Sequence, residues 1–131
     1  MIKSLTAAFA GLILTVAAVA PAAAQMRPPV PLTVSQFDST VAGTPIVLAV
    51  RVVSRVRDDV RGEILERIDD ADYKATGKIV DLYYPQDTPT AMGSGDDVKA
   101  GAVVFVHAVA TTRDRADVKR ATIVTPYVTI K

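Results

Sequence analysis

Valine, isoleucine and leucine recur at every second position over long stretches after residue 45, a period that predicts β-strands. The first stretch, 46–57, favours a strand with one apolar face and one face that turns basic toward its end. The predicted apolar face consists of Ile46, Leu48, Val50, Val52 and Val56. Further strands are predicted at 73–84, 102–111 and 118–130, the last interrupted at Pro126. Because 102–111 is apolar on both faces, we expect it in the middle of the sheet.

Four shorter segments connect or precede these strands. Residues 63–68 fit either a strand that pairs back onto 46–57 or a helical turn, and we favour the strand. Residues 33–37 fit either a short edge strand or the first turn of a helix. Residues 58–62 and 113–117 are rich in Asp, Arg and Gly, and are predicted to be turns.

The order of these elements indicates the fold class. The segment Tyr73-Lys-Ala-Thr-Gly-Lys-Ile-Val-Asp-Leu carries a central glycine, Gly77, which permits a bulge or a sharp bend. A loop and the segment Val98-Lys-Ala-Gly-Ala-Val-Val-Phe-Val follow, with a turn at its glycine. This order resembles an OB-type barrel, the five-stranded Greek-key form. We therefore predict an all-β fold, a small antiparallel barrel of the OB-like five-stranded type, with a β-sandwich as the alternative.

The N-terminal stretch has a different pattern. Lys3 precedes an uncharged run from Leu5 to Ala20, and Pro21 is followed by the small residues 22–24. A charged start, an apolar middle and a small-residue exit are typical of a secretory signal peptide, predicted here at 1–24, with an uncleaved anchor as the alternative. The run is short for a membrane span, which needs roughly 20 apolar residues, so no stable span is expected after cleavage. These features predict a bacterial periplasmic or secreted protein.

Composition narrows the function classes. Residues 25–45 are predicted to be a Pro-rich tail and loop, followed by a single β-barrel domain at 46–131. Lys3 is 1 of the 15 basic residues, so the processed chain would carry 14 basic and 14 acidic side chains. A neutral domain has no bulk field to attract nucleic acid, and nucleic-acid binding is not expected. The chain has 0 cysteines, which excludes disulfides, thiolate catalysis and Cys-bound zinc.

No catalytic constellation is evident. His107 is the only histidine, no nucleophile or acid is paired with it by sequence, and we expect a structural role for it. Acidic residues cluster at 69–72 and at 96–97 but match no calcium-loop pattern, so neither a metal nor a cofactor is predicted. We predict that the protein is not an enzyme. The alternative is a hydrolase that uses Asp81 with Asp96 or Asp97.

Three arginines form the first candidate binding surface. Arg51, Arg55 and Arg57 are predicted to share one strand face, which would suit a small anionic ligand. The competing interpretation is an ordinary solvent face on which they pair with Glu63 and Glu66 across the hairpin.

A loop rich in Pro, Gly, Ser and Thr, 85–95, provides the second candidate surface. Tyr83 and Tyr84 precede it and Met92 lies within it. Tyrosines beside such a loop suit contact with a partner protein or a saccharide, and the alternative is aromatic packing that pins the loop to the barrel rim.

The overall prediction is an exported, non-catalytic binding or accessory domain. Its partner would be a protein or a small anionic or saccharide ligand. The alternative is a structural or assembly subunit that pairs through edge strands at 33–37 and 118–130.

Overall fold

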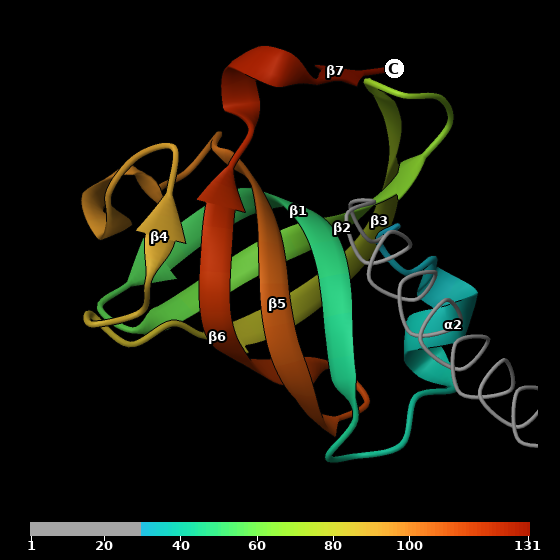
Figure 1. The fold of residues 1–131 in the computed structure, drawn as a ribbon. Helices are drawn as coiled ribbons and strands as arrows, with labels where there is room; N and C mark the ends of the chain where they lie inside the picture. The colour runs from blue at the N-terminus through green and yellow to red at the C-terminus, as the bar shows by residue number, and fades with distance from the viewer. Residues whose placement is uncertain (1–29) are drawn as a thin grey trace, which may run out of the picture.

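The computed structural model describes residues 30–131, so the predicted signal peptide and the start of the Pro-rich tail lie outside the described residues. Within 30–131 the protein is all-β apart from one short α-helix and two 3-10 turns. The strands are β1 (Pro45–Val56), β2 (Asp59–Arg67), β3 (Asp72–Tyr83), β4 (Thr90–Ala91), β5 (Val103–Thr112), β6 (Arg115–Ile123) and β7 (Thr129–Ile130). They form one mixed sheet in the order β4-β6-β5-β1-β2-β3-β7 (Figure 1).

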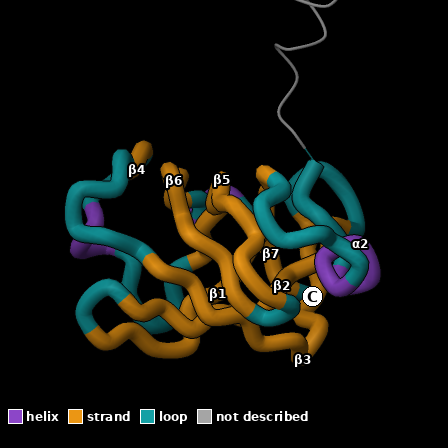
Figure 2. The backbone as a smooth tube through the Cα atoms, turned by 90° about the horizontal axis from the view of Figure 1, so that it is seen from below, coloured by secondary structure: helices purple, strands orange, loops and turns teal. Residues whose placement is uncertain are grey.

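The five long strands form a partly closed ring. β3 also pairs with β6, from Asp81 opposite Arg115 to Tyr83 opposite Asp117, so the ring runs β1-β2-β3-β6-β5 and returns to β1. Figure 2 shows how the sheet curls to bring these strands around a common interior. The closing β3–β6 pair is parallel, as are the pairings of β4 and β7. The prediction of an antiparallel barrel is wrong in this respect, because strand directions cannot alternate all the way around a ring of five.

The segment 63–68 is strand up to Arg67, which confirms the preferred interpretation. Ile64 and Leu65 are each 0% exposed although they lie on opposite sides of β2. Ile64 belongs to the main core and Leu65 to a second cluster on the outside of the sheet. Burial on both sides is a strand property here, since a helical turn would have placed the two side chains on one side.

The two turns predicted at 58–62 and 113–117 are shorter in the structure. Of residues 58–62, only Asp58 belongs to the β1–β2 turn, which it shares with Arg57, a residue with a left-handed φ of 55°. Val60 is instead buried in the core from β2. In the segment 113–117, only the first two residues form the turn. Because each hairpin turn has only two residues, the residues on either side of it belong to the strands, and their side chains continue to alternate between the two faces of the sheet.

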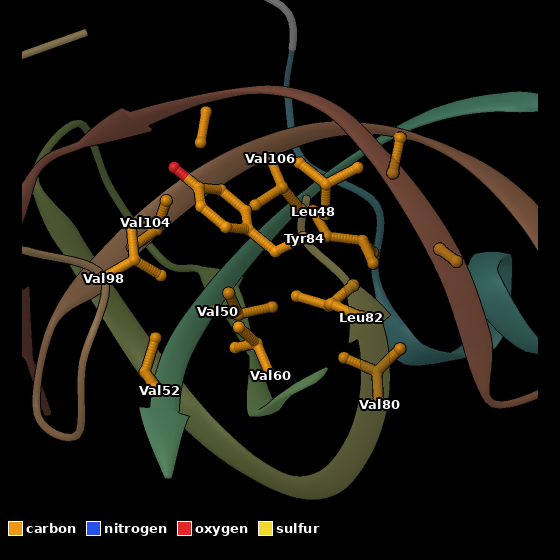
Figure 3. Packing of buried hydrophobic residues seen from close by; sticks show 14 of the residues in the cluster. Leu48, Val50, Val52, Val60, Val80, Leu82, Tyr84, Val98, Val104 and Val106 are labelled. Carbon is orange, nitrogen blue, oxygen red and sulfur yellow. The ribbon is translucent and has the colours of Figure 1, made fainter. Parts of the chain in front are cut away.

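The main core fills the interior of the ring (Figure 3). The predicted apolar face of β1 is confirmed from Ile46 to Val52, but Val56 is 71% exposed. The register between β1 and β2 shifts between Val52 and Ser54, and this bulge turns the last residues of β1 over. Other core members from the strands of the ring include Val60, Ile64, Val80, Leu82, Val104, Val106, Ala108 and Val118.

The predicted last strand ends early, at Ile123. A 3-10 turn, η2 (Thr125–Tyr127), contains Pro126, and β7 then pairs with the start of β3. The break at Pro126 is therefore confirmed. This C-terminal segment covers a second apolar cluster on the outside of the sheet, in which the rings of Tyr73 and Phe105 meet edge to face at 5.8 Å. The remaining members are Ala49, Leu65, Val103, Val124, Val128 and Ile130.

Residues 33–37 do not form an edge strand. They belong mostly to the helix α2 (Val34–Asp38), which lies beside one end of the curled sheet (Figure 1). Thr33 and Gln36 form a reciprocal capping box, which satisfies free backbone donors of the first turn. Phe37 is 1% exposed and packs in the main core. The predicted tail and loop at 25–45 thus contributes a core residue.

Candidate functional site

Two cross-strand rows of side chains lie next to each other on the outer surface of β1, β2 and β3. Cross-strand partners share a sheet face, and the first row runs through Ser54, Arg61 and Asp81. The second row runs through Val56, Asp59 and Tyr83. Arg115 of β6 is paired with Asp81, so the first row continues across the ring closure. The rows flank a shallow groove of about 350 Å³, here called the outer groove. Its lining residues are Ser54, Val56, Asp59, Val60, Arg61, Asp81 and Arg115.

The outer groove presents both hydrogen-bond donors and acceptors. Arg61 Nε lies 3.3 Å from Asp81 Oδ1, and Arg115 Nη2 lies 3.8 Å from Asp59 Oδ1. The four side chains are between 47% and 73% exposed, so each ion pair is weak. A ligand can therefore replace either partner of a pair at low cost. The site can therefore bind a polar group without leaving a buried charge unpaired.

An apolar edge flanks these charges. Val56 and Tyr83 lie on either side of Asp59 in the second row. Val56 is 71% exposed and Tyr83 is 39% exposed, which leaves an aliphatic and an aromatic surface in contact with solvent. An exposed tyrosine combines an apolar ring with a polar hydroxyl and is well suited to ligand contact.

The structure does not bring the three predicted arginines together. Arg51 lies on the outer face, where its Nη2 is 2.7 Å from Glu63 Oε1. Arg55 follows the bulge in β1 and faces inward, opposite the buried Val60. Arg57 is exposed in the β1–β2 turn. The prediction of a shared face is wrong because the bulge reverses the side-chain alternation within β1.

Arg55 caps one mouth of the ring. Its guanidinium lies 4.9 Å from the ring centroid of Tyr84, within the range of a cation–π contact. Its Nη1 donates to the carbonyl oxygens of Gly95 and Val98, at 2.5 and 3.0 Å. With these donors engaged, Arg55 holds the loop after β3 against the core and is a structural residue in this state.

The tyrosines and the methionine of the predicted loop surface lie in different surroundings. Tyr83 is on the edge of the outer groove, whereas Tyr84 is 1% exposed and its hydroxyl hydrogen-bonds to Thr90. Tyr84 is therefore a core residue rather than a contact surface. Met92 is 61% exposed with a left-handed φ of 63° and lines a separate hollow with Asp97. Of the three, only Tyr83 lies beside the outer groove, where it is paired with the lining residue Asp59.

Asp81 and Asp97, one of the two carboxylate pairs of the hydrolase alternative, line different hollows. Asp81 lines the outer groove and is paired with Arg61. Asp97 lines the hollow beside Met92, and its Oδ2 accepts a hydrogen bond from the backbone N–H of Ser94 at 2.9 Å. A two-carboxylate mechanism needs both groups around one bond, and this placement gives it no support.

Glu63 links the hairpin to the bend in β3. Its Oε1 binds Arg51, and its Oε2 accepts the backbone N–H of Gly77 at 2.8 Å. Gly77 has a φ of 77°, a conformation that favours glycine, and the β2–β3 register shifts at this point. The predicted bulge at Gly77 is thus confirmed. The hydrogen bond from Arg51 lowers the pKa of Glu63 from its ordinary 4.5, although partial burial opposes this.

We expect Glu63→Gln to destabilise the protein at neutral pH but not in acid. Because the folded state lowers the pKa of Glu63, its contribution is present above about 4.5 and is lost as the pH falls through the lower folded value. Urea unfolding of both proteins at a series of pH values would measure this. A difference in unfolding free energy that stays constant from neutral pH down to about pH 2 would contradict it.

Sequence reasoning missed Asp59, Arg61 and Arg115 as site residues. All three fall in segments that were predicted to be turns, and turn residues were not assigned to a strand face. A predicted turn of only Arg57 and Asp58 would have paired Asp59 with Val56 and so assigned Asp59 to the outer face of the sheet. The turn position was therefore the missing signal.

The chain matches no protein-family model, no curated protein and no solved structure. Over residues 30–131, no helix is long and apolar enough to cross a membrane, and no group of three or more metal-binding side chains gathers.

Proposed function

We propose that this protein is an exported, non-catalytic binding domain of the OB-like barrel type. The strand order supports the OB-like interpretation. Strands β1 to β3 form a meander, and the β5–β6 hairpin that follows completes the ring. OB-fold domains bind oligonucleotides and oligosaccharides on the face of their second and third strands, near the loops that join strands 1–2 and 4–5. The outer groove occupies the corresponding face of β2 and β3, beside the β1–β2 and β5–β6 turns.

The ligand that suits this groove best is a neutral saccharide. The observation that carries the proposal is the pair of exposed Arg–Asp contacts beside Tyr83, which offers donors, acceptors and an aromatic surface together. Sugar hydroxyls both donate and accept hydrogen bonds, so charged pairs of both signs can serve them. Nucleic acid is disfavoured, because two carboxylates in the groove would repel its phosphates.

The assembly alternative has less support. One of its two proposed edges, 33–37, is largely helical. The other, 118–130, is divided between β6 and β7. β6 has β5 on one side and short pairings with β3 and β4 on the other. β7 stands at the end of the sheet order but has only two residues, Thr129 and Ile130.

We expect neutral oligosaccharides to bind the outer groove. The test is an amide NMR titration with N-acetylglucosamine and glucose oligomers, followed by calorimetry. Tyr83→Ala and Arg61→Gln should each weaken binding by about tenfold or more. Arg67→Gln is the matched control, since Arg67 is also a β2 arginine paired with an aspartate, Asp70, but lies outside the groove.

Two results would count against the proposal. One is an absence of saturable shifts at the groove residues with every saccharide. The other is an equal loss of affinity in Arg61→Gln and Arg67→Gln, which would indicate a nonspecific effect of charge.

A further inference from the structure

A second groove lies on another part of the surface, over β5 and β6 and beside β4. It has a volume of about 400 Å³, and we call it the β6 groove. Its lining residues are Pro89, Thr90, Ala91, His107, Arg120, Ala121 and Thr122. His107 also borders an adjoining hollow whose wall includes Lys119. Three basic side chains, His107, Arg120 and Lys119, therefore lie in or beside this groove.

The cations of the β6 groove have no acidic partner among residues 30–131. All 14 acidic residues of the chain lie between Asp38 and Asp117, yet none of them forms an ion pair with Lys119 or Arg120. Asp117, the nearest acid along β6, is paired with Val109 in the sheet. The positive charge here is thus uncompensated, in contrast to the outer groove.

Arg120 contacts the ring of His107. Its Nη2 lies 3.4 Å from Nδ1 of His107, and a guanidinium can only donate. A hydrogen bond from Arg120 to Nδ1 therefore requires the neutral tautomer that carries its proton on Nε2. Burial lowers the pKa of His107, and the charge of Arg120 lowers it further. The charged groups that line the hollows beside His107 are Arg120 and Lys119, both from β6. The other lining groups, including Val47 of β1 and Thr90 of β4, are uncharged.

We propose that the β6 groove binds the phosphate group of a small molecule, held by Arg120 with His107 as a second donor. A guanidinium can offer two parallel N–H donors to phosphate oxygens. Protonation of His107 would supply a further donor and would offset the second negative charge. Bound phosphate removes the repulsion between Arg120 and the protonated ring, so binding and protonation of His107 favour each other. The site is separate from the outer groove and does not depend on the saccharide proposal.

The test is an NMR titration of the His107 ring against pH, first in sodium chloride and then in inorganic phosphate at equal ionic strength. Phosphate is expected to raise the pKa of His107 by about half a unit or more, which corresponds to about threefold tighter binding to the protonated ring. The rise should saturate with phosphate concentration, because a site binds stoichiometrically and salt screening does not.

Variants identify the donor. Arg120→Gln should abolish the phosphate-dependent rise, while the pKa measured in chloride increases because a neighbouring positive charge is gone. Arg113→Gln is the control, since Arg113 is an exposed arginine in the β5–β6 turn, outside the β6 groove and with no ion pair among the described residues. This variant should respond as the natural protein does. Equal pKa values in chloride and phosphate, or a rise that persists in Arg120→Gln, would overturn the proposal.

Discussion

Tyr84→Ala is expected to lower the free energy of unfolding by about 3–5 kcal/mol, the range for loss of a buried aromatic side chain. Tyr84 is 1% exposed, and its ring lies among Leu48, Val104 and Val106 (Figure 3). Its removal would leave a cavity at the mouth of the ring and would also remove the surface on which Arg55 rests. Urea unfolding followed by circular dichroism measures the change.

Tyr83→Ala is the matched control for this substitution. Tyr83 is the preceding residue and is 39% exposed on the outer face, so its truncation should cost less than about 1 kcal/mol. Tyr84→Phe keeps the ring and removes only the hydrogen bond to Thr90, with an expected loss of about 1 kcal/mol. Equal destabilisation by Tyr83→Ala and Tyr84→Ala would show that Tyr84 is not a core residue.

Ile64→Ala and Leu65→Ala should each lower the free energy of unfolding by about 2–5 kcal/mol. Adjacent residues of a strand point to opposite sides, and both are fully buried here because each side of β2 is covered by apolar groups. Ile68, just after β2, is 55% exposed, so Ile68→Ala should cost less than about 1 kcal/mol.

Chemical denaturation of the three variants under one condition checks this pattern. A small effect of Leu65→Ala would mean that the C-terminal segment does not cover the outer cluster. A large effect of Ile68→Ala would contradict the position at which β2 ends.

The strands could be predicted well because their signal is local. Val80, Leu82 and Tyr84 alternate with Ile79, Asp81 and Tyr83, and the structure buries the first three and leaves the others at least partly exposed. Side-chain alternation requires only neighbouring residues and a covered face, so it can be recognised without knowing the partner strand.

The outer groove could not be predicted in the same way. It depends on the pairing of Arg61 with Asp81, and on Arg115 arriving from the far end of the chain. The bulge after Val52 also changes which side of β1 carries Arg55, because one extra residue reverses every later position. Neither the register nor the bulge has a clear signature in the residues themselves, and the predicted arginine face was wrong for this reason.

The amino-acid order alone determined the β class of this protein, the strand in which His107 lies, the break at Pro126 and the bend at Gly77. Tertiary pairing decided the parallel closure of β3 on β6, the burial of Tyr84 and the assembly of Asp59, Arg61, Asp81 and Arg115 around one groove. The physical reason is range: alternation and proline geometry act within a few residues, whereas register and ring closure depend on contacts between distant segments.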